Sequence, residues 1–506
     1  MEPGYEDEDN RAVAETKRQD SRLPTRTKGK GYHQVVMSGL NNDAQQPGDE
    51  NFDGHMPVEE YGHTLAVVAR QRLWIRGLCV VALALAVDVA ALGIYIFRDN
   101  GSTNSSAGNA NRPLSSSSSP SRIFDIPHWI PLPPSNQRLT KLAFGSCSSQ
   151  FMPQPYWDTI LRYDPDIVIL GGDNVYGDCH EDTCQNLQYA YRNWTQHASF
   201  QGAIQNVPVI ATLDDHDYGT GDADVNNPYK KLAKDFFHEF YSHLTPEVPK
   251  GEEDGVYQQY TWGPPGKRVQ VILLDTRFAR SKFQPNSDDP NAIEGPSEAP
   301  YKPTLAEEQH MLSERQWKWL EEQISKPDVQ IRLLISSIQV LNDGTGFECW
   351  RMLPKERRRL YDLIHEQCNS PIYFLSGDRH MGGFYEYKYD DDEEETRNAN
   401  STNYNSNDMV DTLVEVTASS WTHTVPYGAF DNCTDASTCD EIDPRRIGDF
   451  VRENHFATID IDWEQGNVTL AIRRAETVPG SQYSKKYHKS QVSAGQILQS
   501  RFYNFL

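Results

Sequence analysis

The residues best suited to chemistry stand in short polar clusters, and each cluster follows an apolar run. In chain order the clusters are Gly145-Ser146-Cys147-Ser148, Gly172-Asp173-Asn174-Val175-Tyr176, Asp214-Asp215-His216-Asp217, Asp275-Thr276-Arg277 and Ser376-Gly377-Asp378-Arg379-His380. Any one of them alone reads as an ordinary turn or helix cap, because Asp, Asn and Gly are favoured there. Together they bring carboxylates, a thiol, a phenol and imidazoles, which are the ligand types of metal sites.

The apolar runs before these clusters predict buried strands of an α/β fold. We expect strands at residues 166–170, 207–213, 269–274, 331–335, 371–375 and 412–416, and helices at 188–206, 230–243, 313–326 and 355–368. Residues 456–473, with Gln465-Gly466-Asn467 at their centre, predict a late hairpin. Because ligands of open α/β sheets bind beyond the carboxyl ends of strands, the five clusters are expected to converge on one site.

Length and charge limit the function classes. The chain has 506 residues, enough for one large catalytic domain with appendages or for two domains. Its formal net charge of -24 at pH 7 argues against a nucleic-acid-binding surface, because binding a polyanion requires a positive surface.

One apolar run, residues 73–97, is long enough to span a bilayer. Arg70, Arg72 and Arg76 flank its start, whereas Arg98 beside Asp99 stands at its far end. The positive-inside rule therefore predicts a single-pass type II membrane protein, with the C-terminal part outside the cell or in a secretory or vacuolar lumen. The expected order is a disordered cytosolic tail (1–72), the signal anchor (73–97), a Ser/Asn-rich stalk (98–137), a catalytic domain (138–480) and a C-terminal extension (481–506).

Glycosylation sequons and cysteines fit an exterior domain. The Asn-x-Ser/Thr motifs all follow the apolar run, at Asn100, Asn104, Asn193, Asn400, Asn432 and Asn467. Of eight cysteines, Cys79 lies in the span; the pairs Cys179–Cys184 and Cys433–Cys439 are close enough for small disulfide loops, and Cys349 with Cys368 is a third option. By this elimination Cys147 is left over, either as a ligand or as a buried free cysteine.

The clusters resemble the alkaline phosphatase D-like (PhoD-like) branch of the calcineurin-like metallophosphatases. The resemblance runs from about Leu142 to His423 and is strongest in Gly-Asp-Asn-Val-Tyr-Gly-Asp, Leu-Asp-Asp-His-Asp-Tyr-Gly, Leu-Asp-Thr-Arg and Ser-Gly-Asp-Arg-His. It implies a four-layer α/β/β/α sandwich and hydrolysis of phosphate monoesters and diesters at a site that pairs Fe(III) with calcium.

The resemblance also implies a ligand set. Asp173 matches a carboxylate that bridges two metals, and Cys147, Tyr176 and His380 match the other ligands of the first; thiolate and phenolate suit Fe(III). At the second metal, Asp215 and Asp378 replace the Asn and His of the wider superfamily, which favours calcium, with magnesium or zinc as alternatives. Asn342 is expected to add a weak contact, and Asn174, Asp214, Asp217 and Arg379 to orient the ligands.

Two further residues are expected to act on the substrate. Arg277 is suited to clamp phosphate oxygens with its planar guanidinium, the alternative being an ordinary salt bridge. His216 would hydrogen-bond the phosphate or donate to the leaving group, the alternative being a structural histidine.

Three functions remain open on the sequence: a surface or lumenal phosphomonoesterase or phosphodiesterase, a phospholipase-like diesterase acting on membrane lipids, and a non-catalytic surface glycoprotein. The acidic run 390–395 reads as a solvated loop, with an extra calcium site as the lesser alternative.

Overall fold

The computed structural model describes residues 127–244, 251, 255–286, 300–389, 410–425, 443–475 and 494–505. All of them belong to one compact unit, Ser116–Leu506. Within these ranges no helix is both long and apolar enough to cross a membrane. The predicted tail (1–72), membrane span (73–97), most of the stalk (98–137) and the acidic run 390–395 lie outside the described residues.

The first sheet has six strands in the order β15-β14-β13-β1-β2-β3. Strands β1, β2 and β3 are parallel, and β13, β14 and β15 are added antiparallel beside β1. The hairpin predicted at residues 456–473 is formed by β13 and β14. The strand bounds are β1 Lys141–Gly145, β2 Ile167–Leu170, β3 Val209–Ala211, β13 His455–Asp462, β14 Asn467–Arg474 and β15 Ile497–Asn504.

The second sheet has seven strands in the order β12-β10-β11-β9-β8-β5-β4. Its centre, β11-β9-β8-β5, is parallel, and β10, β12 and β4 run antiparallel to their neighbours. Its strands are β4 Gln258–Trp262, β5 Val269–Leu273, β8 Ile331–Ser336, β9 Ile372–Ser376, β10 Gly382–Lys388, β11 Thr412–Ala418 and β12 Arg446–Val451. The short strands β6 (Gln284–Pro285) and β7 (Tyr301–Lys302) pair separately.

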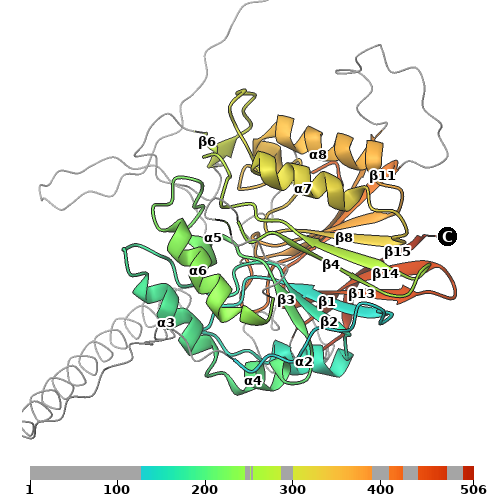
Figure 1. Cartoon of the computed structure of the whole chain (residues 1–506), viewed down its shortest axis with the longest axis horizontal. Coiled ribbons are helices and arrows are strands. Elements are labelled where there is room, and N and C mark those ends of the chain that lie inside the picture. The colour runs from blue at the N-terminus through green and yellow to red at the C-terminus, as the bar shows by residue number, and fades with distance from the viewer. Residues whose placement is uncertain are drawn as a thin grey trace, which may run out of the picture. The chain divides into compact units, whose positions relative to one another are not determined.

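Helices lie on the outer side of each sheet (Figure 1). The longer ones are α2 Tyr156–Tyr163, α3 Gln185–Trp194, α4 Ala198–Ile204, α6 Lys230–Phe240, α7 Glu314–Ile324 and α8 Pro354–Gln367; α5 (Asp215–Tyr218) and the 3-10 turns Ser242–Leu244 and Trp350–Met352 are single turns. Helix α7 starts where the Ser313 side chain accepts a hydrogen bond from Gln316 N, and α8 starts with Pro354 in its first turn.

Two hydrophobic clusters hold these layers together. One contains residues of α2, α3, α4 and α6 with β1, β2 and β3, and it extends to Val271 of β5 and Leu333 of β8. The other cluster packs α7 and α8 against the opposite face of the seven-stranded sheet, through Ile272 of β5 and Leu334 of β8. Strands that are buried on both faces read as continuous apolar runs, which explains why β5 and β8 were recognisable in the sequence. The α/β class is confirmed.

The predicted elements are present with some changes. Every predicted strand is found, with ends shifted by at most two residues. The single helix predicted at 188–206 is wrong: the extended backbone of His197 separates α3 from α4. Strand β15 forms the edge of the six-stranded sheet although it lies in the segment predicted as a C-terminal extension. Trp129, at the end of the predicted stalk, packs in the core.

The structure confirms one cysteine pair and decides the option that was left open. Cys179 and Cys184 form a disulfide, as predicted. Cys349 and Cys368, left open as a third pair, are both free and buried. Helix α8 lies between them, and its 14 residues hold its two ends roughly 20 Å apart. Cys147 is therefore not the sole free thiol, and elimination no longer singles it out. Cys433 and Cys439 lie outside the described residues.

Candidate metal centre

The polar clusters converge at the carboxyl ends of strands from both sheets. Cys147 follows β1, Asp173 follows β2, Asp215 follows β3, and Asp378 and His380 follow β9. Among the described residues, groups of these side chains place metal-binding atoms within 4.8 Å of one another. The convergence expected from the sequence is present.

The backbone at four of these positions is unusual. Cys147, Asp173, Asp378 and His380 have φ values of 60°, 48°, 71° and 52°. This left-handed region is uncommon for residues other than glycine, and such conformations gather at functional sites because the surrounding structure enforces them. The strand-end turns thus aim these side chains inward at a local energetic cost.

One part of the centre, here called the thiol–imidazole half, carries sulfur, phenol and imidazole donors. Cys147 Sγ lies 3.7 Å from Asp173 Oδ2, and Cys147, Asp173 and His380 form one candidate metal-binding group. Tyr176 Oη lies 3.0 Å from His380 Nε2. Burial, and then the charge of Asp173, raise the pKa of both Cys147 and Tyr176 well above their usual values. A cation would reverse this, because thiols and phenols bind metals in their deprotonated form.

His423 belongs to the same half and was not assigned from the sequence. Its Nε2 lies 3.2 Å from His380 Nε2 and 3.2 Å from Tyr176 Oη. It follows β11, a parallel neighbour of β9, at the same sheet edge. That position after a predicted strand is the signal by which it could have been found.

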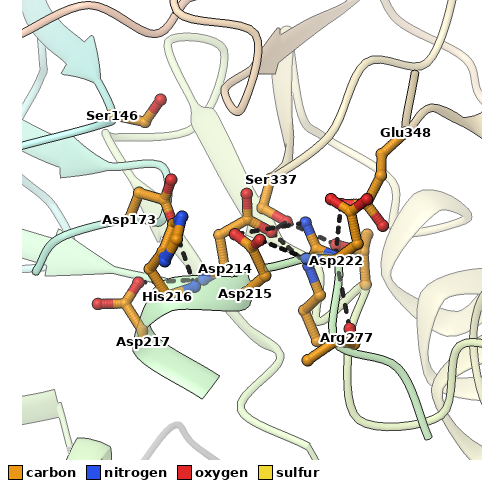
Figure 2. A network of polar contacts seen from close by, with 12 residues as sticks. Ser146, Asp173, Asp214, Asp215, His216, Asp217, Asp222, Arg277, Ser337 and Glu348 are labelled. Atoms are coloured by element: carbon orange, nitrogen blue, oxygen red, sulfur yellow. Dashed lines mark hydrogen bonds and ion pairs between the residues drawn. The ribbon is translucent and has the colours of Figure 1, made fainter. Parts of the chain in front are cut away.

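The other part, the carboxylate half, carries hard oxygen donors. Asp214, Asp215 and Asp378 form one candidate group, and Asp173, Asp215 and His216 form another. Asp173 thereby belongs to a group in each half. Figure 2 shows Asp173 and His216 on one side of Asp214 and Asp215, with Arg277 and Glu348 on the other. Ser337, after β8, donates to Asp214 Oδ1 at 2.5 Å, which gives that strand end a contact in the network.

Arg277 is enclosed by this half. Its side chain is 0% exposed, Nε donates to Asp214 Oδ1 at 2.5 Å, and Nη1 lies 2.7 Å from Glu348 Oε2. Nη2 lies 3.8 Å from Asp215 Oδ1 and has no hydrogen-bond partner among the described residues. Burial alone would raise the pKa of Asp215, but Arg277 and His216 lower it to about 2. Two of three guanidinium nitrogens are engaged, so this arrangement favours the salt-bridge alternative over a bidentate phosphate clamp.

Glu348 was also not assigned from the sequence. It lies in the loop after β8, is buried, and pairs with Arg277 and Arg280. With Asp215 and Asp222 it forms a further group of clustered carboxylates. The two arginines already balance its charge, so we assign no metal to this group.

His216 is held by a carboxylate. Its Nδ1 lies 2.7 Å from Asp178 Oδ1, and its backbone N–H donates to Asp173 Oδ1 at 3.3 Å. Burial alone would lower its pKa, but Asp173 and the hydrogen bond to Asp178 raise the pKa of His216 to about 11. Because Asp178 fixes the orientation of the ring, the imidazole is placed to donate to a phosphate or to a leaving group.

The residues expected to orient ligands divide into two sets. Asp217 accepts from the backbone N–H groups of Asn174 and Val175, and Asp214 and Asp217 form a capping box at the start of α5. These contacts fix the turns that carry Asp173 and Asp215. Asn342 instead accepts from the backbone of Gly344 and Thr345 and donates to Tyr385. The Arg379 guanidinium lies over the Phe347 ring. The Asn342 side chain thus caps the turn of its own loop.

The donor set fits cations on two observations. Asp214 Oδ2 and Asp215 Oδ1 are buried without a hydrogen-bond partner among the described residues. Burial, followed by the neighbouring carboxylates, raises the pKa of Asp173 and of Asp378 well above the usual range. Buried oxygens that lack donors and repel one another are stabilised by a bound cation.

A polar pocket of about 500 Å³ borders the carboxylate half. Asp222 lines it and also belongs to the group with Asp215, whose Oδ2 accepts from Asp222 N at 2.7 Å. Asn226, Lys282 and Tyr301 supply further polar groups to its wall.

Two of the predicted glycosylation sites can be placed. Asn193 lies in α3 and Asn467 begins β14, and both are partly exposed. Asn100, Asn104, Asn400 and Asn432 lie outside the described residues.

An acidic site at strand ends of an α/β fold, with thiol and imidazole donors beside it, defines the class of metal-dependent hydrolases. The chain belongs to the PhoD-like phosphatase family, which matches residues 142–472. It is therefore a hydrolase that acts on phosphoric esters.

One solved structure agrees at the level of the fold. The chain is similar to a structure described as that of PhoD, with 17% sequence identity, a TM-score of 0.52 and coverage of 74% of this chain and 71% of that chain. It also matches GAP50, the anchor in the inner membrane complex of Plasmodium, with 11% identity, a TM-score of 0.40 and coverage of 73% and 90%. No curated protein matches the chain.

Proposed function

We propose that this phosphatase uses two cations, Fe(III) in the thiol–imidazole half and calcium in the carboxylate half. The observation that carries the proposal is the position of Asp173. It belongs to the group with Cys147 and His380, and it also groups with Asp215, which in turn groups with Asp378. Thiolate and phenolate select Fe(III), and carboxylate oxygens select calcium. This arrangement is the one expected on a four-layer α/β/β/α metallophosphatase sandwich.

The cations would supply Lewis acidity toward the phosphate and acidify the attacking water. Cys147, Asp173, Tyr176 and His380 would hold the first, and Asp173, Asp215 and Asp378 the second. His216, oriented by Asp178, is placed to donate a proton to the phosphate or to the leaving oxygen. Arg277 holds Asp214 and Glu348 in place, and the polar pocket beside Asp222 offers room for the alcohol part of the ester.

Metal analysis and spectroscopy of the full-length protein test the proposal. We expect iron and calcium together with activity toward phosphate monoesters or diesters, assayed in parallel. A visible ligand-to-iron charge-transfer band should weaken or shift in Cys147→Ala. A matched control is Cys349→Ala, a buried free thiol outside the metal-binding groups. A colourless, iron-free and fully active protein would rule the proposed iron out.

We further propose that the protein is anchored by residues 73–97, with the catalytic domain outside the cell or in a lumen. The flanking Arg70, Arg72 and Arg76 and the one-sided sequons support this orientation. An endoglycosidase should lower the apparent mass, and Asn193→Gln should remove one glycan step. In the contrary outcome the protein carries no glycan. Added protease then digests the catalytic domain only after the plasma membrane is permeabilised, while the organelles stay sealed. That result would mean that the orientation is reversed.

A further inference from the structure

We infer that His423 is a ligand of the metal in the thiol–imidazole half, adding a second imidazole nitrogen to the predicted set. The inference rests on the proposed function, because it concerns the same metal. It starts from three atoms that lie close to one another. Tyr176 Oη, His380 Nε2 and His423 Nε2 are separated by 3.0, 3.2 and 3.2 Å.

The tautomer of His423 follows from its neighbour Thr422. The Thr422 hydroxyl donates to the Cys147 carbonyl at 3.1 Å and accepts from the Ser149 N–H at 2.9 Å. Its single proton is thereby used, yet Oγ1 also lies 2.9 Å from His423 Nδ1. Nδ1 must therefore carry the proton and donate to Thr422, because the hydroxyl has no second proton to give. In the neutral imidazole this leaves Nε2 as a bare lone pair.

As a proposed ligand of the same metal, His380 would present a lone pair on its own Nε2 as well. His380 Nε2 lies 3.2 Å from His423 Nε2, and the one hydroxyl between them belongs to Tyr176. A phenol has one proton and can donate to only one of the two nitrogens. A cation accepts both lone pairs and the phenolate as well. An Nδ1–H held by a neighbouring oxygen, with Nε2 free, is also the usual orientation of a metal-binding histidine.

The chain segment that carries His423 is fastened to the other ligand loops. Trp421 N donates to Ser146 O at 3.2 Å, Thr422 contacts Cys147, and Val425 N donates to His380 O at 2.8 Å. These bonds tie residues 421–425 to the turns after β1 and β9. The imidazole is thus positioned by the same backbone that positions Cys147 and His380, as a ligand requires.

X-ray absorption at the iron edge of the full-length protein tests the assignment without relying on activity. We expect the wild type to show two imidazole ligands and His423→Ala to show one, with a metal affinity at least about 10-fold lower. His365→Ala is a matched control, since His365 is also partly buried but stacks on Tyr389 at the outer end of α8. It should keep both imidazoles and the wild-type affinity.

Variants of Thr422 test the positioning bond independently. Thr422→Val removes the acceptor for Nδ1 and should weaken metal binding about 10-fold, whereas Thr422→Ser should restore it. His216→Asn excludes the other nearby imidazole, and it should leave the count of imidazole ligands at two. One imidazole in the wild type, or an unchanged count in His423→Ala, overturns the inference while the proposed metal remains. A wild type without any transition metal instead overturns the proposed function.

Discussion

The two halves of the metal centre satisfy their donor atoms in different ways. In the thiol–imidazole half, Cys147 approaches Asp173, and Tyr176, His380 and His423 approach one another through their polar atoms. In the carboxylate half, Asp214 and Glu348 are paired with the buried guanidinium of Arg277. The first half depends on a cation from outside, whereas the second contains a cation of its own.

This difference bears on how tightly each half should hold a metal. In the carboxylate half, Arg277 Nη2 lies 3.8 Å from Oδ1 of Asp215, a proposed ligand, so binding a cation there adds positive charge beside a guanidinium. In the thiol–imidazole half, the thiol, phenol and imidazole donors add to the affinity for the metal. We therefore expect a tightly held first metal and an exchangeable second one.

The largest effect is expected where the halves meet. Asp173→Asn keeps the size of the side chain but removes the charge that both halves share, so both metals and the activity should be lost. Metal content and phosphatase activity measure this directly. Asp182→Asn, an exposed carboxylate, is the control and should behave as the wild type. An Asp173→Asn protein that still holds two metals would place the bridging ligand elsewhere.

Selective chelation of calcium tests the expected difference in metal affinity between the two halves. A calcium chelator should remove the second metal and abolish activity, while the iron content and any visible band persist. Adding calcium back should restore activity, because the carboxylates are held in place by backbone contacts such as Asp222 N to Asp215. Loss of iron together with calcium would contradict the expected difference in affinity.

Arg277→Ala tests the claim that the carboxylate half contains its own cation. Removing the guanidinium leaves Asp214 and Glu348 buried without their partner, and breaking such a pair typically costs about 3–5 kcal/mol of stability. Denaturant unfolding of the metal-depleted protein measures this. Arg358→Ala, which removes a part-exposed pair with Asp362 on α8, should cost less than about 1 kcal/mol. A phosphate clamp predicts the opposite: unchanged stability and a kcat lower by about 10²–10³.

The sequence predicted what lies directly at strand ends. Asp173, Asp215, Arg277 and Asp378 each follow an apolar strand. These strands are buried on both faces, so their continuous apolar runs could be recognised in the sequence. The structure brings all four residues together. His423 also follows a predicted strand, β11, but it lies further from the strand end than the residues that were assigned. Glu348 was missed because it lies still further along the loop after β8, where no local pattern fixes the path of the chain.

Loop geometry also explains why the expected metal contact of Asn342 is not supported by its hydrogen bonds. Asn342 stands close to a strand end, but its side chain caps the turn of its own loop and reaches Tyr385. Asn is favoured in such turns, and sequence alone cannot distinguish a turn-capping amide from a ligand. Cys349 and Cys368 illustrate the same limit, since both are free in the structure and their spacing in the sequence left the pairing open.

Glu415 offers the smallest and most specific test, because it is a buried carboxylate satisfied without a metal. It accepts hydrogen bonds from Ser376 Oγ and from the backbone N–H groups of Val340 and Leu341. Burial nevertheless raises its pKa from 4.5 to about 7. Between these values the folded state binds the proton and the unfolded state does not, so stability contributed by this group falls as pH rises from about 4.5 to about 7.

Glu415→Gln should remove that dependence, because an amide does not titrate. The difference in unfolding free energy between the wild type and the variant should change by roughly 1–3 kcal/mol across this pH window, in favour of the variant at the higher pH. Denaturant unfolding at a series of pH values, with metal supplied throughout, measures it. Parallel profiles would mean that Glu415 is ionised in the folded protein throughout, as the carboxylates of the metal centre are expected to be once a cation is bound. In that case the hydrogen bonds from Ser376, Val340 and Leu341 would themselves stabilise a buried charge. Glu415 and the carboxylate half would then both hold ionised carboxylates, stabilised by hydrogen-bond donors in the first case and by cations in the second.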